Sequence, residues 1–248
     1  MCYGSVTGAH VPTARTPKKT ATTTKKKTTT TTTTTTRRAP LTPDKVLKTA
    51  LRLADKDGIE SLSMRKLATA LKVEAMSLYN HVASKEQILD GLVELVVAEI
   101  ELPSATGDWQ TAMRARAASA HAALLRHPWA TMLFVARINV GPNMLRYVDA
   151  TIGCLRAGGF SYAQADHACN AIDAFIYGFT LQTLHFPLEP EAYATAANSF
   201  LPMIPAEQYP HLRGMSLEVI AGRHSGVQRL ELGLELLLAG FEALRCRH

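Results

Sequence analysis

Long hydrophobic runs are missing from this chain of 248 residues, although 47% of its residues are hydrophobic. No stretch of about 18 consecutive apolar residues occurs, so no membrane-spanning helix is expected. The segment from Met1 to Pro40 also lacks the apolar core of a secretory signal. The hydrophobic residues are sufficient to fill one large or two smaller domain cores. We therefore expect a cytoplasmic protein that makes no use of a membrane.

Cysteine is scarce, with four residues in the chain and no pair in CxxC spacing. This excludes a disulfide framework and the usual zinc spacings. The histidines form no metal triad, and His121, His127 and His167 are interpreted as ordinary helix or cap residues. We expect no metal and no cofactor. The thiols are interpreted as reduced, either buried or idle: Cys2, Cys154, Cys169 and Cys246.

Sequence signatures of common enzymes are absent. The chain contains no GxSxG, Walker loop, HExxH or GxGxxG. The adjacent pair Asp166 and His167 is no catalytic dyad, because neighbouring side chains on a helix point about 100° apart. We expect no enzymatic activity and name no catalytic residue.

Net basic character is confined to the first third of the chain, and no lysine follows Lys85. Residues 1–40 hold eight basic residues and no acid, whereas the whole chain carries only +6. Everything after residue 40 is therefore slightly acidic. A polyanionic partner would have to be bound by the first third.

The segment from Thr13 to Arg38 is rich in Thr and Lys and includes nine consecutive threonines. It has no apolar periodicity, so we expect it to be disordered. It would add phosphate contacts that depend on salt, or it would be a solvated tail or the product of a wrongly chosen start codon.

Four helices are expected between Thr42 and Ile100. Thr42, Pro43 and Asp44 form a helix start, and Gly58 ends that helix. Two short helices, Ser63–Leu71 and Glu74–Asn80, follow with a break of about two residues between them. A fourth helix begins at Ser84 in a capping-box pattern. Two short helices joined so tightly are typical of a helix-turn-helix that presents its second helix to the DNA major groove.

The remainder also has helical periodicity, and no alternating strand pattern occurs. The predicted fold is all-α, with a tail at 1–40, a three-helix helix-turn-helix domain at 41–103, and a larger ligand-binding and dimerisation domain at 104–248. Between Phe186 and Pro210 we expect mostly loop. The predicted helices after the first domain are Asp108–Arg126, Trp129–Ile138, Gly141–Ala157, Ser161–Leu184, Glu191–Phe200 and Ser225–Arg245.

The run GIESLSMRKLATALKVEAMSLYNHVASKEQILDGL resembles the DNA-binding domain of the tetracycline-repressor (TetR) family, most specifically in its LYxHVxxK core. The resemblance implies that Arg65 reaches a base or a phosphate. Asn can bond adenine, and apolar side chains can contact the thymine methyl group. The alternative for Tyr79 and His81 is packing between helices. The resemblance also implies two groups of DNA contacts. The residues that would face base edges are Ala75, Met76, Ser77 and Asn80, and those that would contact phosphates are Tyr79, His81 and Lys85.

This segment departs from the family pattern at two places. Ala75 and Met76 carry no hydrogen-bonding side chain, so base readout would rest on Arg65, Ser77 and Asn80. Lys72 stands where the family usually has glycine. A non-glycine residue at positive φ would cost about 1 kcal/mol.

The segments DWQTAMRARAASAHAALLRHPW, LRAGGF and LELGLELLLAGFEAL resemble the C-terminal domain of the tetracycline repressors. There, two long helices from each subunit form a four-helix dimer interface. Here these would be Tyr162–Leu184 and Ser225–Arg245, and the alternative is packing within one subunit. Small residues that would allow close helix approach are Ala171, Ala174, Gly178, Gly233 and Gly240.

A polar stripe runs along the first of these helices. A polar row on an apolar helix needs partners or water. It would be an intersubunit hydrogen-bonding surface, a wall facing a ligand, or an exposed edge. Its members are Asp166, Asn170, Asp173, Tyr177 and Thr180.

The resemblance also implies a small-molecule effector. The tetracycline-binding relatives hold a magnesium–drug complex through a histidine of the sixth helix, and Phe134 lies near that position. We therefore expect an apolar or aromatic effector instead. The candidate ligand-binding residues, each of which would otherwise belong to the core, are Phe134, Arg137, Met144, Tyr147, Phe175, Phe179 and His185.

The sequence thus predicts a ligand-responsive transcriptional regulator that binds a palindromic operator as a homodimer. It would be a repressor that the effector releases from DNA, although an activator would share these features. The rival interpretations are an enzyme and a DNA-compacting protein that binds through its Thr/Lys-rich tail.

Overall fold

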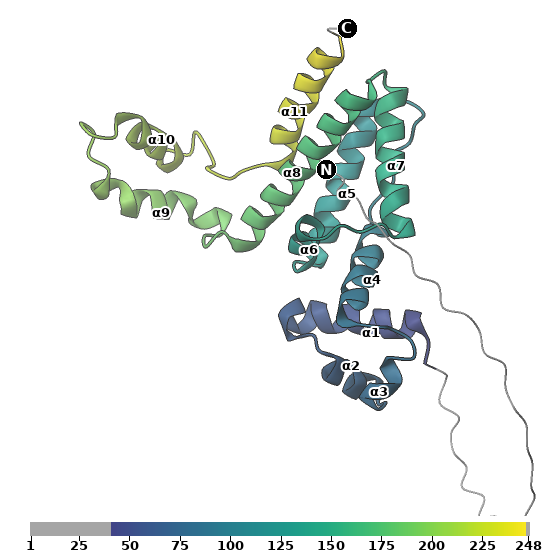
Figure 1. The fold of residues 1–248 in the computed structure, drawn as a ribbon. Coiled ribbons are helices and arrows are strands. Elements are labelled where there is room, and N and C mark those ends of the chain that lie inside the picture. The colour runs from purple at the N-terminus through teal and green to yellow at the C-terminus, as the bar shows by residue number, and fades with distance from the viewer. Residues whose placement is uncertain (1–40, 247–248) are drawn as a thin grey trace, which may run out of the picture. The chain divides into compact units, whose positions relative to one another are not determined.

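The computed structural model describes residues 41–246, and within that range every regular element is a helix (Figure 1). The expected all-α fold is confirmed. The expected disorder of Thr13–Arg38 lies outside the described residues. The α-helices are α1 Pro43–Asp57, α2 Met64–Leu71, α3 Ala75–Leu78, α4 Lys85–Val97, α5 Trp109–Arg126, α6 Ala130–Ala136, α7 Pro142–Ala157, α8 Tyr162–His185, α9 Tyr193–Phe200, α10 Pro210–Ile220 and α11 Leu230–Arg245.

Side-chain caps start most of the longer helices where the sequence predicted them. The Thr42 hydroxyl accepts the Lys45 N–H at the start of α1, and Gly58 ends that helix with φ 80°. Ser84 accepts the Gln87 N–H at the start of α4. Ser161 and Gln164 form a complete capping box on α8. These local bonds satisfy backbone N–H groups that have no partner within the helix.

Helices α1 to α4 share a small core. Val46 and Ala50 of α1 are fully buried, as are Leu67 of α2 and Leu78 of α3. Leu92 of α4 is buried among them. The short helices α2 and α3 are therefore held by their apolar sides, which leaves their polar sides to solvent.

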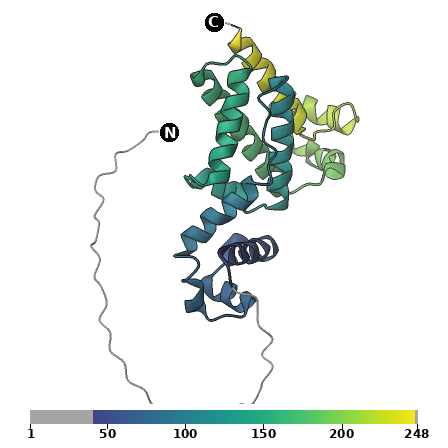
Figure 2. The same cartoon turned by 90° about the vertical axis from the view of Figure 1, so that its right-hand side faces the viewer.

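Helices α5, α7, α8 and α11 lie side by side as a bundle (Figures 1 and 2). Met113 and Leu124 of α5, Leu155 of α7 and Ile172 of α8 are fully buried in it. Helix α4 packs against α1 as well as α5, α6 and α7. It therefore connects the first group of helices to the bundle.

Several predicted boundaries were wrong. Helix α3 covers four residues rather than Glu74–Asn80, α4 ends at Val97 rather than Ile100, and α11 begins at Leu230 rather than Ser225. Helix α10 was not predicted, because it begins with Pro210 directly after a segment rich in proline. Proline fits the first turn of a helix because the missing N–H needs no partner there. Helices α9 and α10 pack on each other.

Within residues 41–246, no helix is both long enough and apolar enough to span a membrane.

Candidate DNA-binding surface and effector site

A left-handed residue makes the turn between α2 and α3. Lys72 has φ 57° and ψ 45°, so it adopts the positive φ expected at a position where the family usually has glycine. Its N–H donates to the Thr69 carbonyl, and the Val73 N–H donates to the Ala68 carbonyl. These bonds end α2 and turn the chain at once into α3.

Helix α3 is anchored by its apolar residues and exposed on its other side. Leu78 is fully buried, and Val82 just after the helix is also buried. Met76 is 76% exposed, and Tyr79 is 48% exposed. The alternative of Tyr79 as a packed residue therefore lacks support. Of the other predicted DNA-binding residues, Arg65, Asn80 and Lys85 are exposed, and Ala75, Ser77 and His81 are half-buried.

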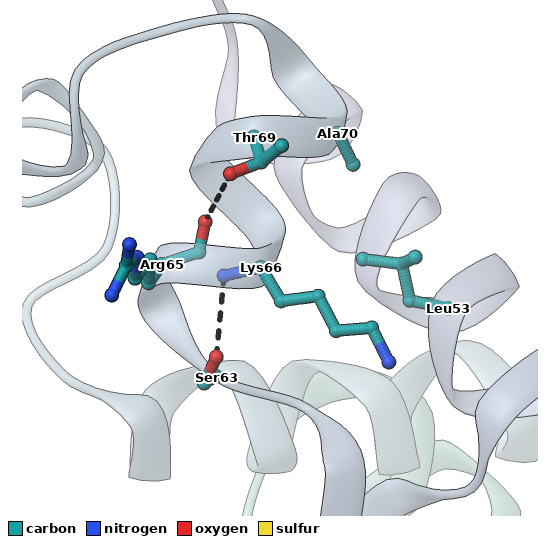
Figure 3. A pocket seen from close by; sticks show the side chains of 6 residues that line it. All are labelled: Leu53, Ser63, Arg65, Lys66, Thr69 and Ala70. Carbon is teal, nitrogen blue, oxygen red and sulfur yellow. Dashed lines mark hydrogen bonds between the residues drawn. The ribbon is translucent and has the colours of Figure 1, made fainter.

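An open groove lies at the start of α2, between α2 and α1 (Figure 3). Ser63, Arg65 and Lys66 line it, and Figure 3 shows Arg65 pointing away from Lys66. The Lys66 ammonium lies 2.7 Å from Asp57, and this hydrogen-bonded pair keeps the pKa of the Asp57 carboxyl below its ordinary value. Arg65 makes no such ion pair among the described residues. Arg65 is therefore the better placed of the two cations to meet an anion.

The predicted ligand-binding residue Arg137 is engaged with α4. Its guanidinium pairs with Glu86 at 2.6 Å and with Asp90 at 2.8 Å. Asn139 donates to the Asp90 carbonyl. Glu86 and Asp90 of α4 thus hold the segment that follows α6.

Glu94 of α4 caps α7. Its two carboxylate oxygens accept the N–H groups of Asn143, at 2.7 Å, and Met144, at 3.0 Å. Gly141 allows this approach, because a Cβ at that position would lie 2.2 Å from the Glu94 side chain. Negative charge at the positive end of a helix is stabilising. This contact was not predicted from the sequence.

A second connection joins α1 to the end of α5 through His127, which was interpreted from the sequence as an ordinary cap residue. Its ring lies 2.7 Å from Asp55 of α1 and 3.1 Å from Glu99, just after α4. Trp129 also donates to Asp55. Burial alone would raise the pKa of the Glu99 carboxyl. The hydrogen bonds from Arg126 and His127 outweigh burial and hold that pKa below its ordinary value.

The predicted effector residues do not form one group. Phe134 meets Tyr177 edge to face at 6.0 Å, and Tyr147 is buried nearby. Phe175 instead lies against Gly233 of α11, where an added Cβ would come within 2.4 Å of its ring. Phe179 packs on His121 of α5. Of the remaining candidates, Met144 packs against the core, and His185 is exposed at the end of α8.

A buried cation that was not predicted lies beside Tyr147. Arg116 of α5 is fully buried, and one of its nitrogens, Nη2, donates to Asp173 of α8. The guanidinium lies 4.7 Å from the centre of the Tyr147 ring. Burial works against the charge, but Tyr147 and Asp173 outweigh it and raise the pKa of Arg116. Burial and Asp173 raise the pKa of the Cys169 thiol to about 12, so it stays protonated.

The polar stripe on α8 divides between two environments. Asp173 pairs with Arg116, and the Thr180 hydroxyl, fully buried, lies 2.8 Å from His121. Asp166 and Asn170, one turn apart, bond to each other on the surface. The stripe is thus inward-facing toward the end of α8 and exposed near its start.

Exposed small and apolar residues occupy one side of α8 and α11. Leu232 and Leu236 are 61% and 71% exposed, although both lie in a long helix. At Gly178 and Gly240, no neighbouring atom lies within 4 Å of the place that a Cβ would take. Gly233, by contrast, faces Phe175 within the same chain. Uncovered apolar surface on long helices is typical of an interface between subunits.

Two family models match the chain. The model described as "Bacterial regulatory proteins, tetR family" matches residues 46–92, and the model described as "Tetracyclin repressor-like, C-terminal domain" matches residues 102–245. Together they cover both groups of helices.

Individual proteins match in the same way. The class D tetracycline repressor of Escherichia coli is 32% identical over 211 residues, which cover 82% of this chain and 90% of that protein. An HTH-type transcriptional regulator of Saccharopolyspora erythraea is 39% identical over 139 residues, 56% of this chain and 59% of its own length. The solved structure of Streptomyces coelicolor ActR with actinorhodin is 30% identical, with a TM-score of 0.72, and the match covers 84% of this chain and 99% of that one.

Proposed function

The chain belongs to the tetracycline-repressor family of transcriptional regulators, and on this basis we propose that it is a ligand-responsive repressor that binds a palindromic operator as a homodimer. We assign DNA binding to residues 41–103, and effector binding and dimerisation to residues 104–248. We also assign it to the cytoplasm and expect no enzymatic activity of its own.

The observation that carries this proposal is the presentation of α3. Leu78 and Val82 fix the helix to the core, while Met76 and Asn80 stay exposed. A side chain can read a base edge only if it reaches into a groove. In this proposal Ala75, Met76, Ser77 and Asn80 face the bases, Arg65 meets a base or phosphate, and Tyr79, His81 and Lys85 hold phosphates.

Dimerisation would use the exposed side of α8 and α11. Leu232 and Leu236 supply apolar area, and Gly178 and Gly240 permit close approach of helices. A symmetric dimer would place two copies of α3 about one DNA turn (~34 Å) apart, so each would read one half of a near-palindrome.

The contacts of α4 offer a route from effector to DNA. Arg137 and Asn139 hold the middle of α4, and Glu94 caps α7. An effector that shifts α6 or α7 would move α4, and with it the angle of α3. The effector releases the operator only if it binds the protein with α4 shifted more tightly than it binds the DNA-bound conformation.

The solved structures of ActR and of an Acinetobacter baumannii TetR variant contain small molecules, actinorhodin in the first and minocycline in the second. By their example we propose an aromatic or apolar effector here too. Among residues 41–246, no three His, Cys, Asp or Glu side chains lie close enough together to hold a metal ion.

The test is selection of binding sites from a random DNA duplex pool by the full chain, followed by footprinting. The proposal expects one enriched near-palindrome with two protected half-sites. A chain without residues 1–40 should select the same sequence. Enrichment of no motif, or loss of the motif with residues 1–40, would support the rival interpretation of non-specific binding through the tail.

A further inference from the structure

The guanidinium of Arg116 is only partly hydrogen-bonded. Its Nη2 donates to Asp173, but among residues 41–246 its Nε and Nη1 have no hydrogen-bond partner. The side chain is fully buried. Buried polar groups in proteins are almost always paired, because an unpaired donor has lost water and gained nothing.

The second such group in the described part of the chain lies on α6. The Thr131 side chain is fully buried, and its hydroxyl oxygen has no partner. Thr131 is one helical turn before Phe134, so the two share a face of α6. Phe134 packs on Tyr177 of α8, which lies one turn after Asp173, the partner of Arg116. Thr131 therefore lies on the helix that meets α8 at the Phe134–Tyr177 contact, and Arg116 of α5 meets α8 at Asp173.

Stability does not explain an arginine at this position. Its neighbours along the same face of α5, Met113 and Ala120, are buried apolar residues. A buried ion pair with unmet donors is commonly no more stable than apolar residues of similar volume. Incomplete pairing is instead what a binding site shows before its ligand supplies the missing acceptor.

The charges around Arg116 favour a neutral acceptor. Arg116 and Asp173 offset each other. Tyr147 and Cys169, also in contact with this pair, have raised pKa values and carry no charge near neutral pH. A carboxylate entering here would leave a net negative charge in the interior, which is costly. A carbonyl oxygen accepts the same N–H groups without adding charge.

The surroundings favour an aromatic ring. The Tyr147 ring lies 4.7 Å from the guanidinium carbon, and the Phe134 and Tyr177 rings lie 6.0 Å apart. Phe134 and Tyr177 are only half-buried, so both rings remain partly open to solvent.

We propose that Arg116 anchors the effector, and that the effector is an aromatic molecule with a neutral carbonyl oxygen, such as a ketone or quinone, that accepts from its unpaired N–H groups. This inference rests on the proposed function, since it assumes that an effector exists. It adds the chemical class of the effector and the residue that selects it.

The test uses matched probes that differ in one substituent. Aryl methyl ketones, the corresponding ethyl arenes and the corresponding aryl carboxylates, each with one, two and three fused rings, are titrated into the full chain by calorimetry. The best ketone should bind about tenfold or more tighter than its ethyl and carboxylate analogues, because a hydrogen bond to a charged donor contributes that much. Equal binding of ketone and ethyl arene, tighter binding of the carboxylate, or no binding by any ketone would overturn the proposal.

Variants then assign the preference to Arg116. The double variant Arg116→Met, Asp173→Leu removes both charges together, so that no buried charge is left alone. It should bind the ketone and the ethyl arene equally, whereas Arg114→Met on the exposed side of the same helix should keep the preference. Circular dichroism shows whether the double variant folds. If it does not fold, Arg116→Lys, which keeps the positive charge, is tested in its place and should weaken ketone binding. Undiminished ketone preference in the folded Arg116 variant would overturn the assignment.

Operator release by the same compounds, measured by fluorescence anisotropy of a labelled operator duplex, separates this inference from the proposed function. If ethyl arenes or carboxylates bind and release the operator, the regulator function stands and the role of Arg116 falls. If ketones bind through Arg116 but the operator stays bound, the ketones are not the effector and this inference falls, while the proposed function still rests on the selection of an operator.

Discussion

The carboxylate of Glu94, near the end of α4, accepts the backbone N–H of Met144 in the first turn of α7 over 3.0 Å. One side chain thus caps a neighbouring helix and connects the DNA-binding helices to the bundle. The same carboxylate also accepts the Asn143 N–H. Any motion of α7 relative to α4 must break or carry these bonds.

Replacing Glu94 by Ala removes both acceptors and should lower the free energy of unfolding by about 1–2 kcal/mol, the usual effect of losing a helix cap. Urea unfolding followed by circular dichroism measures it. Glu101→Ala, at an exposed position just after α4, is the matched control and should change stability by about 0.5 kcal/mol or less. Equal effects of the two variants would show that Glu94 is not a structural link.

Arg116→Met should lower the free energy of unfolding by about 3 kcal/mol, because it leaves the carboxylate of Asp173 without its partner. Asp173 keeps some exposure to solvent, which limits the loss. The double variant Arg116→Met, Asp173→Leu should recover most of the loss, because two apolar side chains replace the ion pair. Asp173→Leu alone completes the comparison. If the losses of the two single variants simply add in the double variant, the pair is not coupled.

Lys72→Gly should raise the free energy of unfolding by about 1 kcal/mol, because glycine adopts φ 57° without the strain of a side chain. Lys48→Gly, in the middle of α1 and exposed, is the opposing control and should lower it by about 1 kcal/mol. Thermal unfolding of the three proteins gives the comparison. A loss of stability in Lys72→Gly would show that the side chain contributes more than the strain costs.

The pKa of Glu99 is lowered in the folded protein, so its contribution to stability is complete above its ordinary value near 4.5 and is lost as pH falls through the lowered value. The difference in unfolding free energy between the wild type and Glu99→Gln should therefore be constant above about pH 5 and shrink below it. Denaturant unfolding at several pH values measures the difference. A difference that grows as pH falls would contradict the sign of this shift.

Local features of the fold could be predicted from the sequence, whereas distant pairings could not. The caps at Thr42 and Ser161 depend on residues three positions away, and the positive φ of Lys72 follows from a two-residue turn. The exposure of Met76 follows from the spacing of buried Leu78 and Val82. These properties are set within one or two helical turns.

The effector site depends on partners far apart in the chain. Arg116 and Asp173 are 57 residues apart, and nothing on α5 alone distinguishes Arg116 from a partly exposed arginine such as Arg114. Arg137 was predicted to bind a ligand, but its partner Asp90 is 47 residues earlier in the chain. Only the packing of the helices decides which polar residues meet.

The claim that α3 and the turn after it read DNA bases is tested most directly by fluorescence anisotropy with the selected operator and a scrambled duplex. Asn80→Ala should weaken operator binding about fivefold to a hundredfold and relax the preference at one base pair, while binding to the scrambled duplex stays unchanged. Tyr79→Ala with Lys85→Ala should instead weaken binding to both duplexes alike. Asn198→Ala, exposed on α9, should change neither. Wild-type operator affinity after substitution of Tyr79, Asn80 and Lys85 together would contradict the account.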